Sequence, residues 1–329
     1  MPLYNNVLEL VGNTPIVKIN KLNPEGVEMY VKIESSNPAG SVKDRIAVGM
    51  VLDAETRGLL KPGATLIEST AGNTGIALAM VAAQRGYKFI AVLSESASLE
   101  RIKILKFLGA KVLLTPKTMP ATGRNKMAED VAAQNGWFVC RQADNPANPR
   151  THFNTTAVEI QRDFEGKQLD YFVSGYGTGG TISGTANALK QERPNLHVVI
   201  CEPAKAPILS TGKWEHHGIP GWTPDFVPPN LDTKVFDQIV GVSDEEAHET
   251  CLALARSEGI MVGISAGATF ASALKVAKNA PKGSCFLVML PDSAERYMST
   301  ALFGNISAET DNVEGYHEWM QANYVPKEA

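Results

Sequence analysis

The chain has 329 residues, of which 44% are apolar and 20% charged, and its formal net charge at pH 7 is -4. This length predicts roughly two domains with a core that needs neither disulfides nor a structural metal. A slightly acidic chain lacks the electrostatic footprint of a nucleic-acid-binding surface. No apolar run reaches the ~18 residues that span a bilayer, and the first residues lack the basic start of a signal peptide. We therefore expect a soluble cytoplasmic protein that binds neither nucleic acid nor membrane.

The cysteines and histidines form no metal-binding pattern. The four cysteines are dispersed along the chain: Cys140, Cys201, Cys251 and Cys285. Three of them lie in apolar runs, which is typical of buried thiols that act as small hydrophobic groups. The six histidines include no HExxH motif, and the pair His216-His217 lies in a segment rich in Gly and Pro. We expect this pair in a solvated loop and expect no catalytic metal.

Short β-rich runs alternate with helical stretches for most of the length. We expect strands at residues 30–33, 65–67, 89–93, 112–114, 171–173, 198–200 and 286–290. Helices are expected at residues 46–55, 76–85, 99–108, 155–164 and 245–257. Ser41 followed by Asp44 has the form of a capping box at the first of these helices. The alternation predicts βαβ units and mostly parallel sheets.

Two segments lack any periodicity. Residues 143–149 consist of Ala, Asp, Asn and Pro, which is turn chemistry, and residues 211–229 are rich in Gly, Pro and Trp. The first segment is the better internal boundary. We expect two α/β units joined near position 145.

A glycine-rich loop at residues 175–181 follows the expected strand 171–173 and opens a helical stretch. Glycines allow close approach of the backbone to a phosphate, and the helix N-terminus supplies free N–H groups. Gly175, Gly177 and Gly180 fit the GxGxxG pattern, and Glu202 follows at the distance typical of a ribose-binding acid. The loop therefore indicates anion binding. Either a dinucleotide or a single phosphate monoester fits it.

Three further loops carry candidate side chains. Lys43 lies at the expected start of a helix, where the helix dipole lowers the pKa of an amine, as a nucleophilic lysine requires. An exposed lysine paired with Asp44 is the alternative. Residues 68–75 combine hydroxyls and an amide before a helix, and they can hold a carboxylate or merely cap the helix. Ser265, taken alone, is typical of an N-cap.

Taken in order, these loops resemble those of the fold-type II pyridoxal-phosphate enzymes, specifically the cysteine synthase (O-acetylserine sulfhydrylase) family. The resemblance extends from Gly12 to Tyr297, about nine-tenths of the chain. It implies two three-layer α/β domains with mostly parallel twisted sheets, similar to the tryptophan synthase β fold. The smaller, mobile domain would comprise residues 40–150, and the larger one residues 1–39 plus 151–329.

The resemblance also implies residue roles around pyridoxal 5'-phosphate. Lys43 would hold the cofactor as an internal aldimine and then act as the base at the substrate Cα. Asn73 would hydrogen-bond the 3-oxygen of the cofactor, and Ser265 would face its pyridine nitrogen. The phosphate would be bound by Gly177, Thr178, Gly179, Gly180 and Thr181. The substrate carboxylate would be bound by Thr70, Ala71, Gly72, Thr74 and Gln142.

The implied reaction is β-replacement of O-acetyl-L-serine by sulfide, which gives L-cysteine and acetate through an α-aminoacrylate intermediate. Cystathionine β-synthase and β-cyanoalanine synthase activities remain alternatives within the family. The family also implies a homodimer, with serine acetyltransferase as a candidate partner. An NAD-dependent oxidoreductase is the alternative from another class. It rests on the Gly175 pattern and Glu202, and it gives no reason for Lys43, Asn73 and Ser265 to occur together.

Four places depart from the usual family sequence. Ala71 stands where a serine is common, and Ala143 replaces a frequent aromatic residue. The run 94–98 differs from the usual Pro-Glu-Thr-Met-Ser, and Trp222 lies in a run, 221–226, that is usually richer in glycine. None belongs to the cofactor-binding set. We therefore expect these departures to act on the choice of donor and nucleophile.

Overall fold

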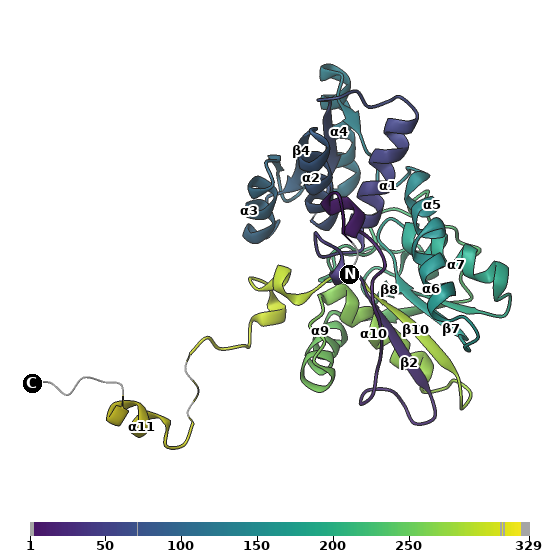
Figure 1. Ribbon diagram of the computed structural model, residues 1–329, viewed down its shortest axis with the longest axis vertical. Coiled ribbons are helices and arrows are strands. Elements are labelled where there is room, and N and C mark those ends of the chain that lie inside the picture. Colours follow the sequence, from purple (N-terminus) through teal and green to yellow (C-terminus); the bar gives the residue numbers. More distant parts are fainter. Residues whose placement is uncertain (1–2, 71, 310, 312, 324–329) are drawn as a thin grey trace, which may run out of the picture.

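The computed structural model describes residues 3–70, 72–309, 311 and 313–323, and these residues form two β-sheets flanked by helices (Figure 1). The larger sheet has the strand order β1-β2-β10-β7-β8-β9. Its strands are β1 (Ile16–Lys18), β2 (Glu28–Ile33), β10 (Cys285–Leu290), β7 (Tyr171–Gly175), β8 (His197–Pro203) and β9 (Gln238–Val242). Only the β1–β2 pair is antiparallel among these described strands. The prediction of mostly parallel sheets is confirmed.

The smaller sheet is fully parallel, with the order β5-β4-β3-β6. Its strands are β3 (Thr65–Ser69), β4 (Lys88–Ser94), β5 (Lys111–Thr115) and β6 (Phe138–Val139). The helices around it are α1 (Lys43–Thr56), α2 (Asn73–Arg85), α3 (Leu99–Phe107) and α4 (Ala121–Asn135). Leu66 packs with α1 and α2, whereas its neighbour Ile67 packs with α4. Adjacent strand residues thus bury opposite faces, and the sheet is the middle of three layers.

The larger sheet is also the middle of three layers. Its helices are α5 (Ala147–Asn154), α6 (Thr156–Asp163), α7 (Gly180–Glu192), α8 (Ile208–Thr211), α9 (Asp244–Ala253) and α10 (Ile264–Ala277). Val173 packs in the core with α9 and α10, and Phe172 packs on the other face with α6 and α7. The neighbouring strand β10 is buried at every position, as expected for a strand covered on both faces. The predicted three-layer α/β architecture is confirmed.

Several expectations about element ends were wrong. The predicted capping box does not form: α1 begins at Lys43 after Val42, Ser41 Oγ accepts from the Lys43 N–H, and an Asp44 carboxylate oxygen accepts from the Ala39 N–H. Ser265 is no N-cap, because α10 begins one residue earlier. The helix expected at 245–257 ends as α9 at Ala253 and continues as a π-helical turn, Leu254–Glu258.

The C-terminal helix α11 (Tyr316–Asn323) lies apart from both sheets, at the far end of the C-terminal segment (Figure 1). The strands of the smaller sheet all fall within residues 40–150, and those of the larger sheet all fall outside that range. The division into a mobile and a larger domain stays a prediction. Over the described ranges, no helix is both long enough and apolar enough to cross a membrane.

The four cysteines are buried and free, as predicted. Burial raises the pKa of three of these thiols, Cys201, Cys251 and Cys285, to about 12. Such thiols stay protonated and make poor nucleophiles or ligands. Among the described residues, no three His, Cys, Asp or Glu side chains come together as a metal site.

Candidate active site

The carboxyl ends of β3, β7 and β10 open onto one cavity of about 920 Å³. Ligands of open α/β sheets bind at this edge of the strands. The predicted residues that line this cavity come from five separate chain segments: Lys43, Thr70, Gly72, Asn73, Thr74, Gln142, Gly177, Thr178, Gly179, Thr181 and Ser265. Gly180 lies between two of them as the first residue of α7. Ala71 lies outside the described residues. The structure thus gathers nearly the whole predicted set at one place.

Lys43 is the first residue of α1 and faces the cavity. Desolvation lowers the pKa of its amine, while the carboxylates of Asp292 and Glu34 oppose that shift. Asp44, the alternative partner of this lysine, is engaged with the Ala39 N–H. An amine with a lowered pKa in a cavity is a candidate nucleophile and base.

The loop after β10 holds the side chain of Asn73. The Asn73 Nδ2 group donates to an Asp292 oxygen at 2.6 Å, and the Asn73 oxygen accepts from Arg296 at 2.6 Å. Tyr297 also donates to Asp292, whose other carboxylate oxygen is buried without a partner in the described structure. Asp292, Arg296 and Tyr297 had no role predicted from the sequence. Their only signal was their place directly after the last core strand.

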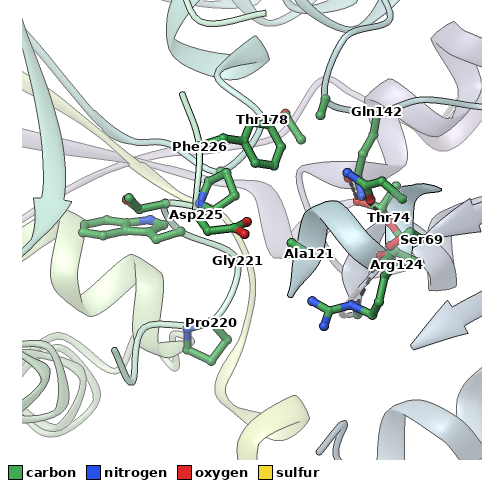
Figure 2. Close-up of a pocket in the computed structure, with 18 of the residues that line it drawn as sticks. Ser69, Thr74, Ala121, Arg124, Gln142, Thr178, Pro220, Gly221, Asp225 and Phe226 are labelled. Carbon is green, nitrogen blue, oxygen red and sulfur yellow. Dashed lines mark hydrogen bonds between the residues drawn. The ribbon is translucent and has the colours of Figure 1, made fainter. Parts of the chain in front are cut away.

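A chain of hydrogen bonds orients Gln142 next to the start of α2, as Figure 2 shows for Gln142, Thr74 and Ser69. The Thr74 hydroxyl donates to Gln142 Oε1 at 2.6 Å, and Gln142 Nε2 donates to the Ser69 carbonyl at 3.1 Å. The backbone N–H groups of Arg141 and Gln142 donate to Glu68. Burial raises the pKa of Glu68 to about 7. The side chains of Thr74 and Gln142 are therefore fixed before any substrate binds.

The glycine loop at residues 177–181 has the shape of a cup for a small anion. A Cβ on Gly177 would lie 2.1 Å from the Gly221 carbonyl oxygen, and one on Gly180 would lie 1.8 Å from Asn148 Oδ1. Gly179 has a φ of +82° and abuts Leu231. Only glycines fit these three positions, so the backbone N–H groups at the start of α7 are left uncovered by side chains. The loop fits the phosphate end of a cofactor.

Glu202 does not serve as a ribose-binding acid. Its side chain is 1% exposed, and it accepts hydrogen bonds from the Leu209 N–H and the Ser210 hydroxyl. Both carboxylate oxygens are thus engaged by the segment after β8. Glu202, which favoured a dinucleotide in the sequence, is thus a structural residue.

Two charged side chains that sequence analysis missed stand on opposite sides of the cavity, Arg124 of α4 and Asp225 of the irregular segment 211–229 (Figure 2). The Thr122 hydroxyl donates to one Asp225 oxygen at 3.3 Å, while the other oxygen is buried without a partner among the described residues. Arg124 donates to the Met119 carbonyl, and burial lowers the pKa of its guanidinium. Arg124 lies in no recognisable motif, and the only signal for Asp225 is its place in the run 221–226.

The irregular segment also contributes Trp222 and the histidine pair. Trp222 is buried against Gly175, where a Cβ would lie 2.1 Å from its ring. His216 is exposed, as expected, but His217 is half-buried and its Nε2 lies 3.2 Å from the Thr223 carbonyl. Both histidines line the cavity, so the prediction of a plainly solvated pair was wrong for His217.

Comparison with known proteins decides the family. Residues 7–292 match the family described as Pyridoxal-phosphate dependent enzyme. The chain belongs to this family. It is 50% identical over 312 residues to the O-ureido-L-serine synthase of Streptomyces lavendulae, covering 95% of this chain and 96% of that one. It is 47% identical to a probable cysteine synthase of Bacillus subtilis (strain 168), covering 93% and 100% of the two chains.

A solved structure supports the same assignment. The crystal structure of O-ureido-L-serine synthase superposes with a TM-score of 0.93 at 49% identity, covering 97% of this chain and 99% of that chain. The protein is therefore a pyridoxal-phosphate enzyme of the cysteine synthase family, which carries out β-replacement on small molecules. The predicted family, fold, enzyme class and cofactor are confirmed. The dinucleotide interpretation of the glycine loop is set aside.

Proposed function

We propose that the enzyme replaces the acetate of O-acetyl-L-serine with sulfide and so forms L-cysteine. The observation that carries the proposal is the convergence of Lys43, Asn73, Gln142, Ser265 and the glycine cup on one cavity. Bound pyridoxal phosphate supplies an electron sink for negative charge at the substrate Cα. In this proposal the phosphate lies in the cup, Asn73 meets the 3-oxygen, and Ser265 meets the ring nitrogen.

Lys43 is the group proposed to attach the cofactor and to move the Cα proton. Its lowered pKa supports both roles, because an amine must lose its proton before it can attack or act as a base. A hydroxyl at Ser265 does not favour a protonated ring, which suits elimination of a β-substituent better than transamination. Thr74 and Gln142 are proposed to bind the substrate carboxylate, together with the backbone of the loop 70–74.

The test is cysteine formation from O-acetyl-L-serine and sulfide by the purified enzyme and its Lys43→Ala variant. Lys43→Ala should lose almost all turnover, because both the attachment group and the base are gone. Lys61→Ala removes an exposed lysine remote from the cavity and serves as the matched control. Full activity in Lys43→Ala would contradict the proposal.

A second candidate is the synthesis of O-ureido-L-serine from O-acetyl-L-serine and hydroxyurea. The Arg124–Asp225 pair supports it, because a guanidinium can donate to a carbonyl and a carboxylate can accept from an amide N–H. Sulfide needs neither group, and the cavity of about 920 Å³ has room for a larger nucleophile. The 50% identical relative from Streptomyces lavendulae bears the name of that activity.

The kcat/KM values for sulfide and for hydroxyurea, measured in the wild type and in Asp225→Asn, distinguish the two candidates. If sulfide is the acceptor, Asp225→Asn leaves kcat/KM for sulfide within about twofold, and hydroxyurea is a poor substrate. If hydroxyurea is the acceptor, its kcat/KM exceeds that of sulfide. Asp225→Asn then lowers it about tenfold, as expected for a hydrogen bond to a charged group.

A further inference from the structure

Helix α5 places two buried polar side chains, Asn148 and His152, one turn apart behind the glycine cup. Their side chains are 0% and 1% exposed. α5 and α7 pack closely at Gly184, where a Cβ would lie 2.0 Å from the Pro149 carbonyl oxygen. Residues four apart on a helix point the same way, so both side chains face the start of α7. Asn148 abuts the cup at Gly180, and neither residue lines the cavity.

Asn148 contacts the first hydroxyl of the cup. Its Nδ2 atom lies 2.9 Å from Thr178 Oγ1 and 2.7 Å from the Gln142 carbonyl oxygen. A carbonyl oxygen can only accept, so the atom between these two partners must be the amide nitrogen. Asn148 therefore donates to Thr178 Oγ1. The hydroxyl proton of Thr178 is then free to point elsewhere.

His152 contacts the second hydroxyl of the cup, that of Thr181. Its Nε2 lies 3.1 Å from Thr181 Oγ1, and its Nδ1 lies 2.8 Å from Thr156 Oγ1. Burial, reinforced by the nearby charge of Arg45, lowers the pKa of His152 to about 3, so the ring is neutral near pH 7 and carries one N–H. If the Thr156 hydroxyl donates to Nδ1, that one N–H is on Nε2 and points at Thr181.

We propose that Asn148 and His152 are positioning residues for the cofactor phosphate: Asn148 donates to Thr178 Oγ1, and His152, as the Nε2–H tautomer, donates to Thr181 Oγ1, so that both hydroxyl protons point into the cup. The loop 175–181 contains no lysine or arginine. A phosphate dianion held there depends on neutral donors, and their orientation matters. The inference rests on the cup being the phosphate site in the proposed function. It does not depend on which nucleophile the enzyme uses.

The test uses the holoenzyme and three variants. His152→Phe keeps the bulk of the ring and removes the donor, whereas His152→Gln keeps a side-chain N–H. Thr185→Val is the matched control, because Thr185 is fully buried on helix α7, which begins at the glycine cup, and its hydroxyl has no partner in the described structure. Each variant is measured by phosphorus NMR of the bound phosphate and by the dissociation constant of the cofactor.

His152→Phe should shift the phosphorus resonance and weaken cofactor binding about tenfold, the loss expected for one hydrogen bond to a charged group. The resonance of this variant should also move between about pH 6 and about pH 8, where a less tightly held phosphate titrates. His152→Gln should recover part of the affinity, and Thr185→Val should match the wild type. A His152→Phe enzyme indistinguishable from Thr185→Val would overturn the inference.

A double-mutant cycle with Thr181→Val separates positioning from folding. If His152 acts through the Thr181 hydroxyl, His152→Phe adds no further loss of cofactor affinity in the Thr181→Val background. Additive losses would show that His152 acts only on packing and would overturn the inference. A wild-type enzyme without any bound phosphorus resonance would overturn both this inference and the proposed function. Failure of the cysteine assay alone would overturn only the latter.

Discussion

Replacing Arg45 with methionine should destabilise the protein strongly, because this arginine neutralises two buried carboxylates. Arg45 lies two residues after Lys43 on α1, and its side chain is 1% exposed. Its guanidinium donates to Glu34 at 2.6 and 2.9 Å and to Glu159 at 2.7 and 2.8 Å. These bonds fasten the start of α1 to the segment after β2 and to α6.

The expected loss of stability follows from the charges that remain in the Arg45→Met variant. Without Arg45, the buried carboxylates of Glu34 and Glu159 share a single cation, Lys32, which lies 2.9 Å from Glu159. One buried negative charge is left uncompensated, and breaking a buried pair in this way costs about 3–5 kcal/mol. Burial raises the pKa of both carboxyls, but in the intact network the interactions with Arg45 outweigh it and hold both pKa values below their usual range, that of Glu159 at about 2. The variant loses this stabilisation of the ionised carboxylates.

The assay is urea unfolding of the holoenzyme, followed by tryptophan fluorescence at a fixed cofactor concentration. Arg57→Met is the matched control, since this arginine follows the same helix, is 58% exposed and pairs with Asp53 at 3.3 Å. An exposed pair of this kind contributes about 0.5 kcal/mol or less. A loss of exposed-pair size is the contradicting result. If the free energy of unfolding of Arg45→Met falls by less than about 1 kcal/mol, the reasoning about uncompensated buried charge is refuted.

Three further results are expected. The folded-state pKa of Glu68 is about 7, above its ordinary value of 4.5, so its contribution to stability falls as pH rises from about 4.5 to about 7. Glu68→Gln should remove that loss, seen as a gain over wild type of up to about 1.4 kcal/mol per pH unit in urea unfolding. An equal pH dependence in both proteins would contradict it. Gly180→Ala should cost about 1–3 kcal/mol and release cofactor on dialysis, because the added Cβ collides with Asn148. Unchanged cofactor retention would show that the cup tolerates a side chain. Gln142→Ala should raise KM for O-acetyl-L-serine several-fold, since about 1 kcal/mol of hydrogen bonding is lost, with a smaller change in kcat. An unchanged KM would place the substrate carboxylate elsewhere.

The sequence predicted the strands that contain an apolar run, most plainly those that are apolar along their whole length. Residues 89–93 and 286–290 are covered on both faces, and such runs are visible without any tertiary information. β1 and β6 were missed because three and two residues carry no periodicity. β9 was missed because it contains a glycine and follows a long irregular segment, so only its pairing with β8 defines it.

The same distinction holds for the candidate site: residues with a local sequence signal could be predicted, and isolated residues could not. Lys43 and the glycine cup could be predicted, because helix starts and glycine runs leave local signals. Arg124 and Asp225 could not, since each is an isolated charged residue that becomes part of the site only when α4 and the segment 211–229 meet across the cavity. Asp292 lies far from Asn73 in the chain, and only the folded structure shows that they are hydrogen-bonded.

The visible absorption spectrum of the purified protein tests the central claim most directly, namely that the cavity holds pyridoxal phosphate and acts on O-acetyl-L-serine. We expect a yellow protein whose absorption band moves to longer wavelength on addition of O-acetyl-L-serine and returns on addition of sulfide. A band that O-acetyl-L-serine leaves unchanged would contradict the proposed donor. A protein that stays colourless after addition of pyridoxal phosphate would contradict the account of the site as a whole.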